Sequence, residues 1–362
     1  MQRVNVHHVA ARAGVSIKTV SRVINDEPNV RPTTREAVLN AINELGYRPD
    51  TSARRLAGRR SFRIALLYED PGPYTSPSAS YVTELQGGVL ARTQTQGYEL
   101  LIHPFEGTSG VAAETVSRLI NENRLDGCII APPFSDLQGL TAALDDERMP
   151  SVRISPGVRT RADESVRTND RELCAEMTNY LASLGHERIG FLIGHPDHRA
   201  VQNRYVGFRE ALEALSLPLH KHLVEQGDNS FESGQRAARR LLSGAHARPT
   251  AIIASNDDMA AGVLYVAHEL GLNVPRDLSV AGFDDAPLAR HLWPTLTTIR
   301  QPIFELAGAA ADLLFARLRG HDTKRLPRTI LGELKIRDST GPAPADGGAA
   351  RADSTQRRPA KV

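Results

Sequence analysis

The sequence predicts an N-terminal all-α helix-turn-helix head with a hinge helix, followed by an α/β body of two doubly wound parallel-sheet subdomains. Two patterns predict this division. Short amphipathic segments broken by glycine fill residues 1–50, and from residue 62 onward short apolar strands alternate with amphipathic helical stretches. Such alternation over a long stretch is typical of parallel sheets covered by helices.

Charge separates the same two parts of the chain. Residues 1–60 contain 11 Lys or Arg against 5 Asp or Glu, out of chain totals of 44 and 42, so the remainder is mildly acidic. A basic head on an acidic body suggests that the head meets a polyanion, although a solvated basic face would look the same.

Length and composition are those of a soluble, multidomain protein. The chain has 362 residues, of which 41% are hydrophobic and 24% charged, which is enough for two or three domains. No apolar run approaches the roughly 18 residues that a membrane span needs. The start, MQRVNVHH, has no apolar signal-peptide core, so we expect a cytoplasmic protein without a membrane partner. Cys128 and Cys174 fit no zinc motif, and we expect both to be small core residues.

The head begins with two short helices joined by a tight turn. Asn5 is a suitable N-cap for a helix over residues 6–13, and Gly14 can end it with positive φ. Ser16 can cap a second helix from Ile17 to about Asn25. Packing across the turn is expected from Ala10, Val20 and Val23, which leaves a polar face on the second helix.

That polar face is suited to the major groove of DNA. Arg22 can donate two hydrogen bonds to a guanine edge, Lys18 can reach a base or a phosphate, and Ile17 can contact a thymine methyl group. The short hydroxyl donors are suited to phosphates, and they are Ser16, Thr19 and Ser21. The alternative is a small helical domain with an exposed polar face.

A third helix and a basic strip complete the head. Pro32 suits the first turn of a helix that runs to Leu45 and ends at Gly46. The strip that follows places Leu56 among arginines that include Arg54 and Arg55. A leucine in this setting can wedge between base steps from the minor groove while the arginines hold phosphates, whereas the alternative is a flexible basic linker.

The head resembles the LacI/GalR family of bacterial repressors. The resemblance runs from about Val4 to Gly58 and rests on VAARAGVSIKTVSRVIN, TREAVLNAINELGYRP and ARRLAG. It implies a DNA-binding domain over residues 1–48 and a hinge helix or linker over 49–60 that forms in the DNA-bound dimer. Ile17, Lys18 and Arg22 would then read bases, and Ala53 and Leu56 would enter the minor groove. Arg31 departs from the Ser-like cap that is usual in the family.

The body extends over residues 61–338. Strand-like runs and helical stretches alternate through it, namely FRIALLY, YELLIH, GCIIAP, RIGFLIG, TAIIAS and LSVAGF for the strands, and RELCAEMTNYLASLG, NRYVGFREALEAL and MAAGVLYVAHELG for the helices. The motifs LASLGHERIGFLIG, ASNDDMAAGVL and VAGFDD with PTLTTIRQP continue the resemblance. They imply a body similar to periplasmic sugar-binding proteins, with subdomains of about 62–160 with 292–324 and 161–291 with 325–338, joined by three crossing strands.

Polar residues follow several predicted strands, where doubly wound sheets bind ligands. Asn256 and Asp284 each follow a strand, and Arg204 begins a helix after another. Their amide, carboxylate and guanidinium groups can bind paired sugar hydroxyls, and matching family positions hold the effector. Gln301, near a crossing strand, is a further candidate. The alternative for Asn256 and Asp284 is that they cap the helices that follow.

Other candidates for ligand contact are weaker. The resemblance implies that Ser80 and Tyr81, after a Pro- and Ser-rich loop, start a helix that faces the ligand. Phe231 and Trp293 could stack on a sugar ring, although core packing is the alternative for each. His195 and His198 lie close in sequence but lack a third ligand, so we expect no metal. We expect no cofactor and no catalytic residues, because no nucleophile elbow or phosphate-binding glycine loop is present. The acidic pairs at 257–258 and 284–285 are attributed to solvation and capping.

The resulting hypothesis is a transcriptional regulator, most simply a repressor, that binds a near-palindromic operator in double-stranded DNA as a homodimer in the nucleoid. A small-molecule effector, expected to be a mono- or oligosaccharide or a derivative, would bind between the subdomains and change DNA affinity. Residues 339–362 are expected to form a disordered tail. The alternatives are an enzyme with an accessory DNA head, a transport binding protein, and an architectural DNA binder that ignores ligands.

Overall fold

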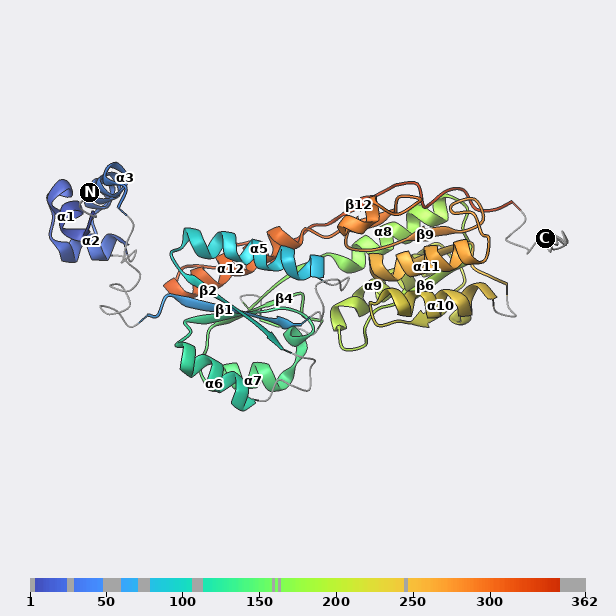
Figure 1. Ribbon diagram of the computed structural model, residues 1–362, viewed down its shortest axis with the longest axis horizontal. Coiled ribbons are helices and arrows are strands. Elements are labelled where there is room, and N and C mark those ends of the chain that lie inside the picture. The colour runs from blue at the N-terminus through green and yellow to red at the C-terminus, as the bar shows by residue number, and fades with distance from the viewer. Residues whose placement is uncertain are drawn as a thin grey trace, which may run out of the picture. The chain divides into compact units, whose positions relative to one another are not determined.

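The structure is a computed structural model that describes residues 4–24, 29–47, 60–70, 79–105, 113–157, 160–161, 164–243 and 247–345 (Figure 1). The chain separates into two compact units, Met1–Phe62 and Arg63–Val362. No helix in these ranges is long and apolar enough to span a membrane.

The N-terminal unit contains helices α1 (Val6–Ala13), α2 (Ile17–Ile24) and α3 (Pro32–Leu45). The Asn5 side chain accepts hydrogen bonds from the backbone N–H groups of His7 and His8, at 3.0 and 3.3 Å. Gly14, with φ of 66°, and Gly46, with φ of 59°, end α1 and α3 in the left-handed region that favours glycine. The predicted three-helix head is therefore confirmed.

A small apolar cluster holds these three helices together. It consists of Val9 and Ala10 from α1, Val20 and Val23 from α2, and Val38 and Ala41 from α3. The predicted contact of Ala10 with Val20 and Val23 across the turn is thus confirmed. Arg31 makes no side-chain capping bond to α3, as its departure from a Ser-like cap suggested.

The first lobe of the body is a six-stranded parallel sheet in the order β11-β5-β4-β3-β1-β2. Its strands are β1 (Arg63–Glu69), β2 (Glu99–Phe105), β3 (Gly127–Ile130), β4 (Ser151–Ile154), β5 (Ser165–Thr168) and β11 (Thr329–Ile330). Helices α5 (Ala79–Thr95) and α12 (Ile303–Arg319) lie on one face, and α6 (Ala113–Asn123) and α7 (Gln138–Asp146) lie on the other (Figure 1). A short 3-10 helix, η2 (Phe134–Asp136), precedes α7.

The second lobe is a four-stranded parallel sheet in the order β7-β6-β8-β9. Its strands are β6 (Ile189–Ile193), β7 (Val224–Gln226), β8 (Ala251–Ala254) and β9 (Ser279–Ala281). One face is covered by α8 (Asp170–Ser183) and α9 (Arg199–Ala214), and the other by α10 (Phe231–Ser243) and α11 (Asp257–Glu269). Two 3-10 helices, η3 (Lys221–Leu223) and η4 (Pro287–Arg290), lie in its loops.

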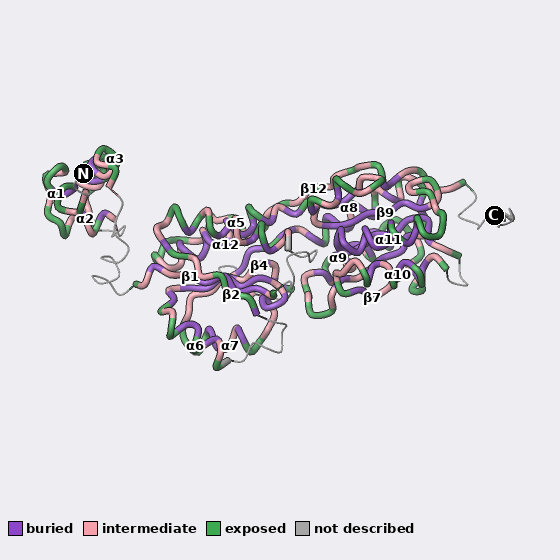
Figure 2. The backbone as a smooth tube through the Cα atoms, viewed as in Figure 1, coloured by how far each residue is buried: buried purple, intermediate pink, exposed green. Residues whose placement is uncertain are grey.

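The central strands of both sheets are buried because helices cover both faces of each sheet, which explains the continuous apolar runs in the sequence (Figure 2). Residues Ile64 to Leu67 of β1 are fully buried, as are Ile252 and Ala254 of β8. Cys128 packs in the core of the first lobe and Cys174 in the core of the second, both as free thiols. The predicted role of both cysteines as core residues is confirmed.

The crossings between the lobes lie later in the chain than predicted. Residues 165–168 and 329–330 pair with the first sheet, although the predicted boundaries at 160 and 325 assigned them to the second subdomain. Strands β10 (Thr298–Arg300) and β12 (Glu333–Lys335) form an antiparallel pair, and bridges join the β10 segment to the end of β9 rather than to the first lobe. The predicted boundary at 292 is therefore also too early.

The segment after residue 338 is also packed against the body. Ser339 and Thr340 are buried, and the Ser339 hydroxyl donates to the Val280 carbonyl at 2.6 Å. The Gly341 carbonyl lies 3.0 Å from His186 Nε2, and the Ala343 amide donates to the Leu184 carbonyl at 2.9 Å. The predicted disordered tail therefore cannot begin at 339, and its residues from 346 onward lie outside the described ranges.

Candidate functional site

The exposed face of α2 carries the predicted base-reading residues. Ile17 keeps 41% of its surface exposed, and Lys18 and Arg22 are exposed on the same helix. Val20 and Val23 face the core, as their spacing requires. An exposed isoleucine beside two cations is an arrangement that can contact base edges and phosphates together.

The predicted phosphate donors have a partly structural role. The Ser16 hydroxyl accepts a hydrogen bond from the Thr19 backbone N–H at 3.1 Å and lies 2.9 Å from the Thr19 hydroxyl. The bond to the Thr19 N–H provides a partner for a backbone donor in the first turn of α2, which has none within the helix. Ser21 is half-buried on the same helix. The hinge residues predicted to enter or flank the minor groove, Ala53, Arg54, Arg55 and Leu56, lie outside the described residues.

A pocket of about 170 Å³ lies in the body and is lined by residues of both lobes. All of the effector-contacting residues predicted from the sequence line it, namely Ser80, Tyr81, Arg204, Asn256, Asp284 and Gln301. The wall also includes Tyr68 and Glu69 at the end of β1 and Ala131 after β3, so the pocket lies at the carboxyl ends of strands.

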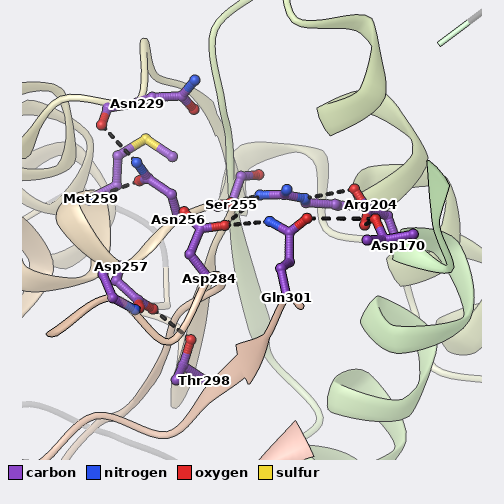
Figure 3. Close-up of polar contacts among 12 residues, drawn as sticks. Asp170, Arg204, Asn229, Ser255, Asn256, Asp257, Met259, Asp284, Thr298 and Gln301 are labelled. Carbon is purple, nitrogen blue, oxygen red and sulfur yellow. Dashed lines mark hydrogen bonds and ion pairs between the residues drawn. The ribbon is translucent and has the colours of Figure 1, made fainter. Parts of the chain in front are cut away.

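Arg204 is the centre of the polar network in this pocket (Figure 3). It is 8% exposed, and its Nε donates to Asp170 Oδ2 at 3.2 Å. Its Nη1 donates to the Ser255 carbonyl oxygen and lies 3.7 Å from Asp284 Oδ1. The guanidinium carbon lies 3.8 Å from the centre of the Phe283 ring. Arg204 is thus held by two carboxylates, one carbonyl and one aromatic face.

Asp284 connects this network to the crossing segments. Gln301 Nε2 donates to Asp284 Oδ1 (Figure 3). Thr168 Oγ1 lies 3.5 Å from Gln301 Oε1 and donates to Asp170 Oδ1. Asp284 has a φ of 122°, which is a strained backbone for a residue other than glycine. Burial raises the pKa of Asp284 to about 6, against the lowering effect of Arg204 and Gln301. The helix that follows Asp284, η4 (Pro287–Arg290), has Ala286 as its N-cap, so the capping alternative is wrong for Asp284.

Asn256 both caps a helix and lines the pocket. Its Oδ1 accepts from the Met259 amide at 3.0 Å at the start of α11, and its Nδ2 donates to the Asn229 carbonyl at 2.8 Å (Figure 3). The capping alternative is therefore observed for Asn256. The Oδ1 atom of Asn256 can accept one more hydrogen bond and its Nδ2 atom can donate one more, so a ligand in the pocket can still bond to this side-chain amide.

Ser80 and Tyr81 lie at the start of α5 and form part of the pocket wall that belongs to the first lobe. Burial raises the pKa of the Tyr81 hydroxyl, with the carboxylate of Asp284 acting in the same direction. Tyr81 therefore stays protonated and can both donate and accept a hydrogen bond.

Several acidic residues in and around the pocket did not stand out in the sequence. Asp170 begins α8 directly after β5, where the strand-end rule would have found it. Asp257 and Asp258 are 0% and 7% exposed, so the attribution of this pair to solvation is wrong. Asp257 accepts from the Thr298 hydroxyl at 2.5 Å and from the Ala286 amide at 2.8 Å, while Asp258 lines the pocket. The Asp285 side chain is 2% exposed and is paired with Arg337 and Arg290.

The remaining candidates divide between the pocket and other places. His195 and His198 line the pocket, with His198 Nε2 at 3.6 Å from Glu69 Oε2. The described residues contain no cluster of three or more His, Cys, Asp or Glu that could hold a metal. Phe231 packs against Tyr265 with ring centres 5.9 Å apart, and Trp293 is 84% exposed. Neither lines the pocket, so sugar stacking is not supported for either ring, and core packing is wrong for Trp293.

Comparison with known proteins finds two matching family models. The model described as "Bacterial regulatory proteins, lacI family" matches residues 5–50, and the model described as "Periplasmic binding protein-like domain" matches residues 178–340. The chain is 32% identical to the HTH-type transcriptional regulator DegA of Bacillus subtilis (strain 168) over 342 residues, which cover 94% of this chain and 99% of DegA. It is 31% identical to the HTH-type transcriptional repressor PurR of Vibrio vulnificus (strain CMCP6), over 92% of this chain and 98% of PurR.

Two solved structures are similar to this chain over most of its length. A complex of the transcriptional regulator CelR with cellobiose superposes with a TM-score of 0.70 at 30% identity, covering 93% of this chain and all of that one. A lac repressor dimer bound to operator and the anti-inducer ONPF gives a TM-score of 0.68 at 27% identity, covering 94% of this chain and all of that one.

Proposed function

The chain belongs to the lacI family of bacterial regulatory proteins, and from this premise we propose that it binds a near-palindromic operator as a homodimer and represses transcription under the control of an effector of the sugar class. The chain is a DNA-binding transcriptional regulator and not an enzyme, because its relatives over nearly their full length are transcriptional regulators.

The operator-binding part of the proposal is supported by α2. Its exposed face presents Ile17, Lys18 and Arg22, while Val20 and Val23 fix the helix on the core of the head. One bidentate contact from an arginine to guanine contributes about 1–3 kcal/mol of base discrimination. A homodimer would present two such faces to two half-sites. The solved lac repressor that this chain resembles is a dimer on its operator. A repressor of this kind would act at the nucleoid, because its operator is part of the chromosomal DNA.

The effector part of the proposal is carried by one observation: the pocket combines polar residues of both lobes with residues at the crossings. Ser80 and Tyr81 come from the first lobe, Arg204 from the second, and Gln301 follows β10 where the chain crosses. A ligand bound there would contact both lobes at once, so it would favour one relative angle between them. The resemblance to a CelR–cellobiose complex supports a mono- or oligosaccharide or a derivative.

The direct test combines binding-site selection with a ligand panel. Full-length protein selects duplexes from a random DNA pool, and the selected sequence is then titrated with and without each of a series of mono- and disaccharides. We expect a sequence with two inverted half-sites and at least one sugar that changes its affinity. Selection of no sequence would overturn the operator proposal, and an unchanged affinity with every sugar would overturn the effector proposal.

A further inference from the structure

Acidic groups predominate in the pocket. Among the described residues, its wall contains six carboxyl groups, two imidazoles and one guanidinium group, with the carboxyl groups belonging to Glu69, Glu84, Asp170, Asp228, Asp258 and Asp284. Asp170 and Asp284 share Arg204, Asp228 pairs with Arg236 at 3.0 Å, and Glu69 lies near His198. Anionic ligands such as sugar phosphates are therefore disfavoured, because Arg204, the guanidinium that the described part of the wall provides, is already held by protein oxygens.

Two carboxyl groups of the wall, Asp258 and Glu84, have neither a hydrogen bond nor an ion pair within the described part of the chain. Glu84 is exposed, whereas Asp258 is buried, with 7% of its surface exposed. Burial and the negative charge of Asp284 raise the pKa of Asp258 to about 7. A buried, unpaired carboxylate is costly to a protein, and the cost is removed when a cationic donor contacts it.

A purely structural role for Asp258 does not explain why its side chain lines the pocket. Asp258 lies in the first turn of α11, where a carboxylate is favoured by the helix dipole. The dipole, however, gives no reason for the side chain to line a pocket or to lie beside a second carboxylate. Asn256 already caps this helix through its bond to the Met259 amide.

We propose that the effector is a small amine of the amino-sugar class, whose protonated amine donates to the Asp258 carboxylate. This inference rests on the proposed function, since it names the ligand class of the same pocket. The size of the pocket agrees with it, because about 170 Å³ is close to the roughly 150 Å³ of a cavity that admits a benzene ring, so one sugar ring fits better than two. Hydroxyl groups of the ring then bond to Asp284, Asn256 and Gln301.

The first test measures the preference for an amine. Full-length protein is screened by thermal shift and then calorimetry against D-glucosamine, D-galactosamine and D-mannosamine, each beside its parent hexose, its N-acetyl derivative and its 6-phosphate. We expect at least one amine to bind about 10- to 100-fold more tightly than its parent hexose and its N-acetyl derivative, as loss of a charge-assisted hydrogen bond predicts. A neutral or phosphorylated sugar that binds as tightly as the best amine overturns the proposal, and so does a screen in which no amine binds.

The second test assigns the preference to Asp258. Asp258→Asn should lose the 10- to 100-fold preference for the amine while the parent hexose binds as before, and Asp258→Glu should retain a preference because it keeps the negative charge. Glu176→Gln is the matched control, because Glu176 is an exposed carboxylate on α8 that does not line the pocket. An amine preference that survives in Asp258→Asn contradicts the assignment.

The outcomes separate this inference from the proposed function. If hexoses bind and no amine is preferred, the amine proposal is overturned, while the proposed control by a sugar remains. A screen in which no sugar of any charge shifts the melting temperature would remove both.

Discussion

At the residue scale, the pocket depends on how its charged side chains are paired. Arg204 is held by Asp170 and Asp284, so its charge is compensated before any ligand arrives. Asp258 has no such compensation within the described ranges. A buried carboxylate without a partner lowers the stability of the ligand-free protein, and it can strengthen the binding of a ligand that supplies the partner.

The first prediction concerns the pH dependence of stability. The pKa of Asp258 is raised from its ordinary value to about 7, so the folded chain holds this proton more tightly than the unfolded chain. The free energy of unfolding should therefore fall as pH rises from about 4 to about 7. Asp258→Asn removes the contribution of Asp258, while Asp284, whose pKa is raised to about 6, keeps part of the pH dependence. The melting temperature of the variant should exceed that of the wild type at pH 8 by about 2–4 °C for each kcal/mol recovered.

Thermal denaturation of the ligand-free protein at pH 5 and pH 8 checks this sign. The advantage of Asp258→Asn should be smaller at pH 5, where Asp258 is already protonated in the folded chain. An equal melting temperature for variant and wild type at pH 8 would mean that the carboxylate finds compensation in solution.

At the element scale, contacts between helices determine which glycines can be replaced by alanine. A Cβ atom on Gly88 of α5 would lie 2.2 Å from the Phe304 carbonyl oxygen and 2.8 Å from the Ala307 Cβ on α12. Gly139, on α7, has nothing within 4 Å. These two positions are thus matched glycines in helices, one at a close helix contact and one in open space.

We predict opposite effects for alanine at these positions. Gly88→Ala should lower the free energy of unfolding by about 1–3 kcal/mol, because α5 and α12 must move apart to admit the methyl group. Gly139→Ala should be neutral or raise it by up to about 1 kcal/mol, because alanine favours the helix. Urea denaturation measures both changes, and equal values for the two variants would exclude close packing of α5 on α12.

The same scale applies to α2 and its proposed contact with base edges. Arg22→Ala should abolish discrimination between the selected operator and random duplex while leaving weak, salt-dependent binding, because phosphate contacts carry no sequence information. Arg12→Ala removes the same charge from α1, where Arg12 pairs with Glu44 at 2.5 Å, and should keep its discrimination. Fluorescence anisotropy at two salt concentrations compares them, and intact specificity in Arg22→Ala would refute the role given to this side chain.

At the scale of the whole molecule, the order of elements was predictable and the long-range pairing was not. Gly14 and Gly46, the buried valines of the head and the apolar strands of the body have local signatures, so the head and the two sheets follow from sequence. The pocket residues Arg204, Asn256 and Asp284 follow because carboxyl ends of parallel strands meet at one edge, and Gln301 was predicted from its place near a crossing strand. The pairing of β5 and β11 with the first sheet depends on contacts between residues more than 150 positions apart, which no local pattern reports.

Asp258 was missed for a similar reason. Two adjacent aspartates after Asn256 look like solvated or capping residues, and only the folded chain reveals that both are buried. The absence of a partner is a property of the surroundings in three dimensions. The segment at 339–343 was misjudged because its hydrogen bonds to Val280, His186 and Leu184 come from distant elements.

The central claim is that a ligand in the pocket and DNA at the head influence each other. The most direct measurement titrates full-length wild type and Asp284→Ala against the selected duplex, with and without each hexose and each hexosamine of the panel. We predict that at least one sugar changes the wild-type affinity about 5- to 150-fold and that the same sugar leaves Asp284→Ala unchanged, because Asp284 joins Arg204 to Gln301 at the crossing. A wild-type affinity that no sugar alters, or a response that persists in Asp284→Ala, would contradict the claim.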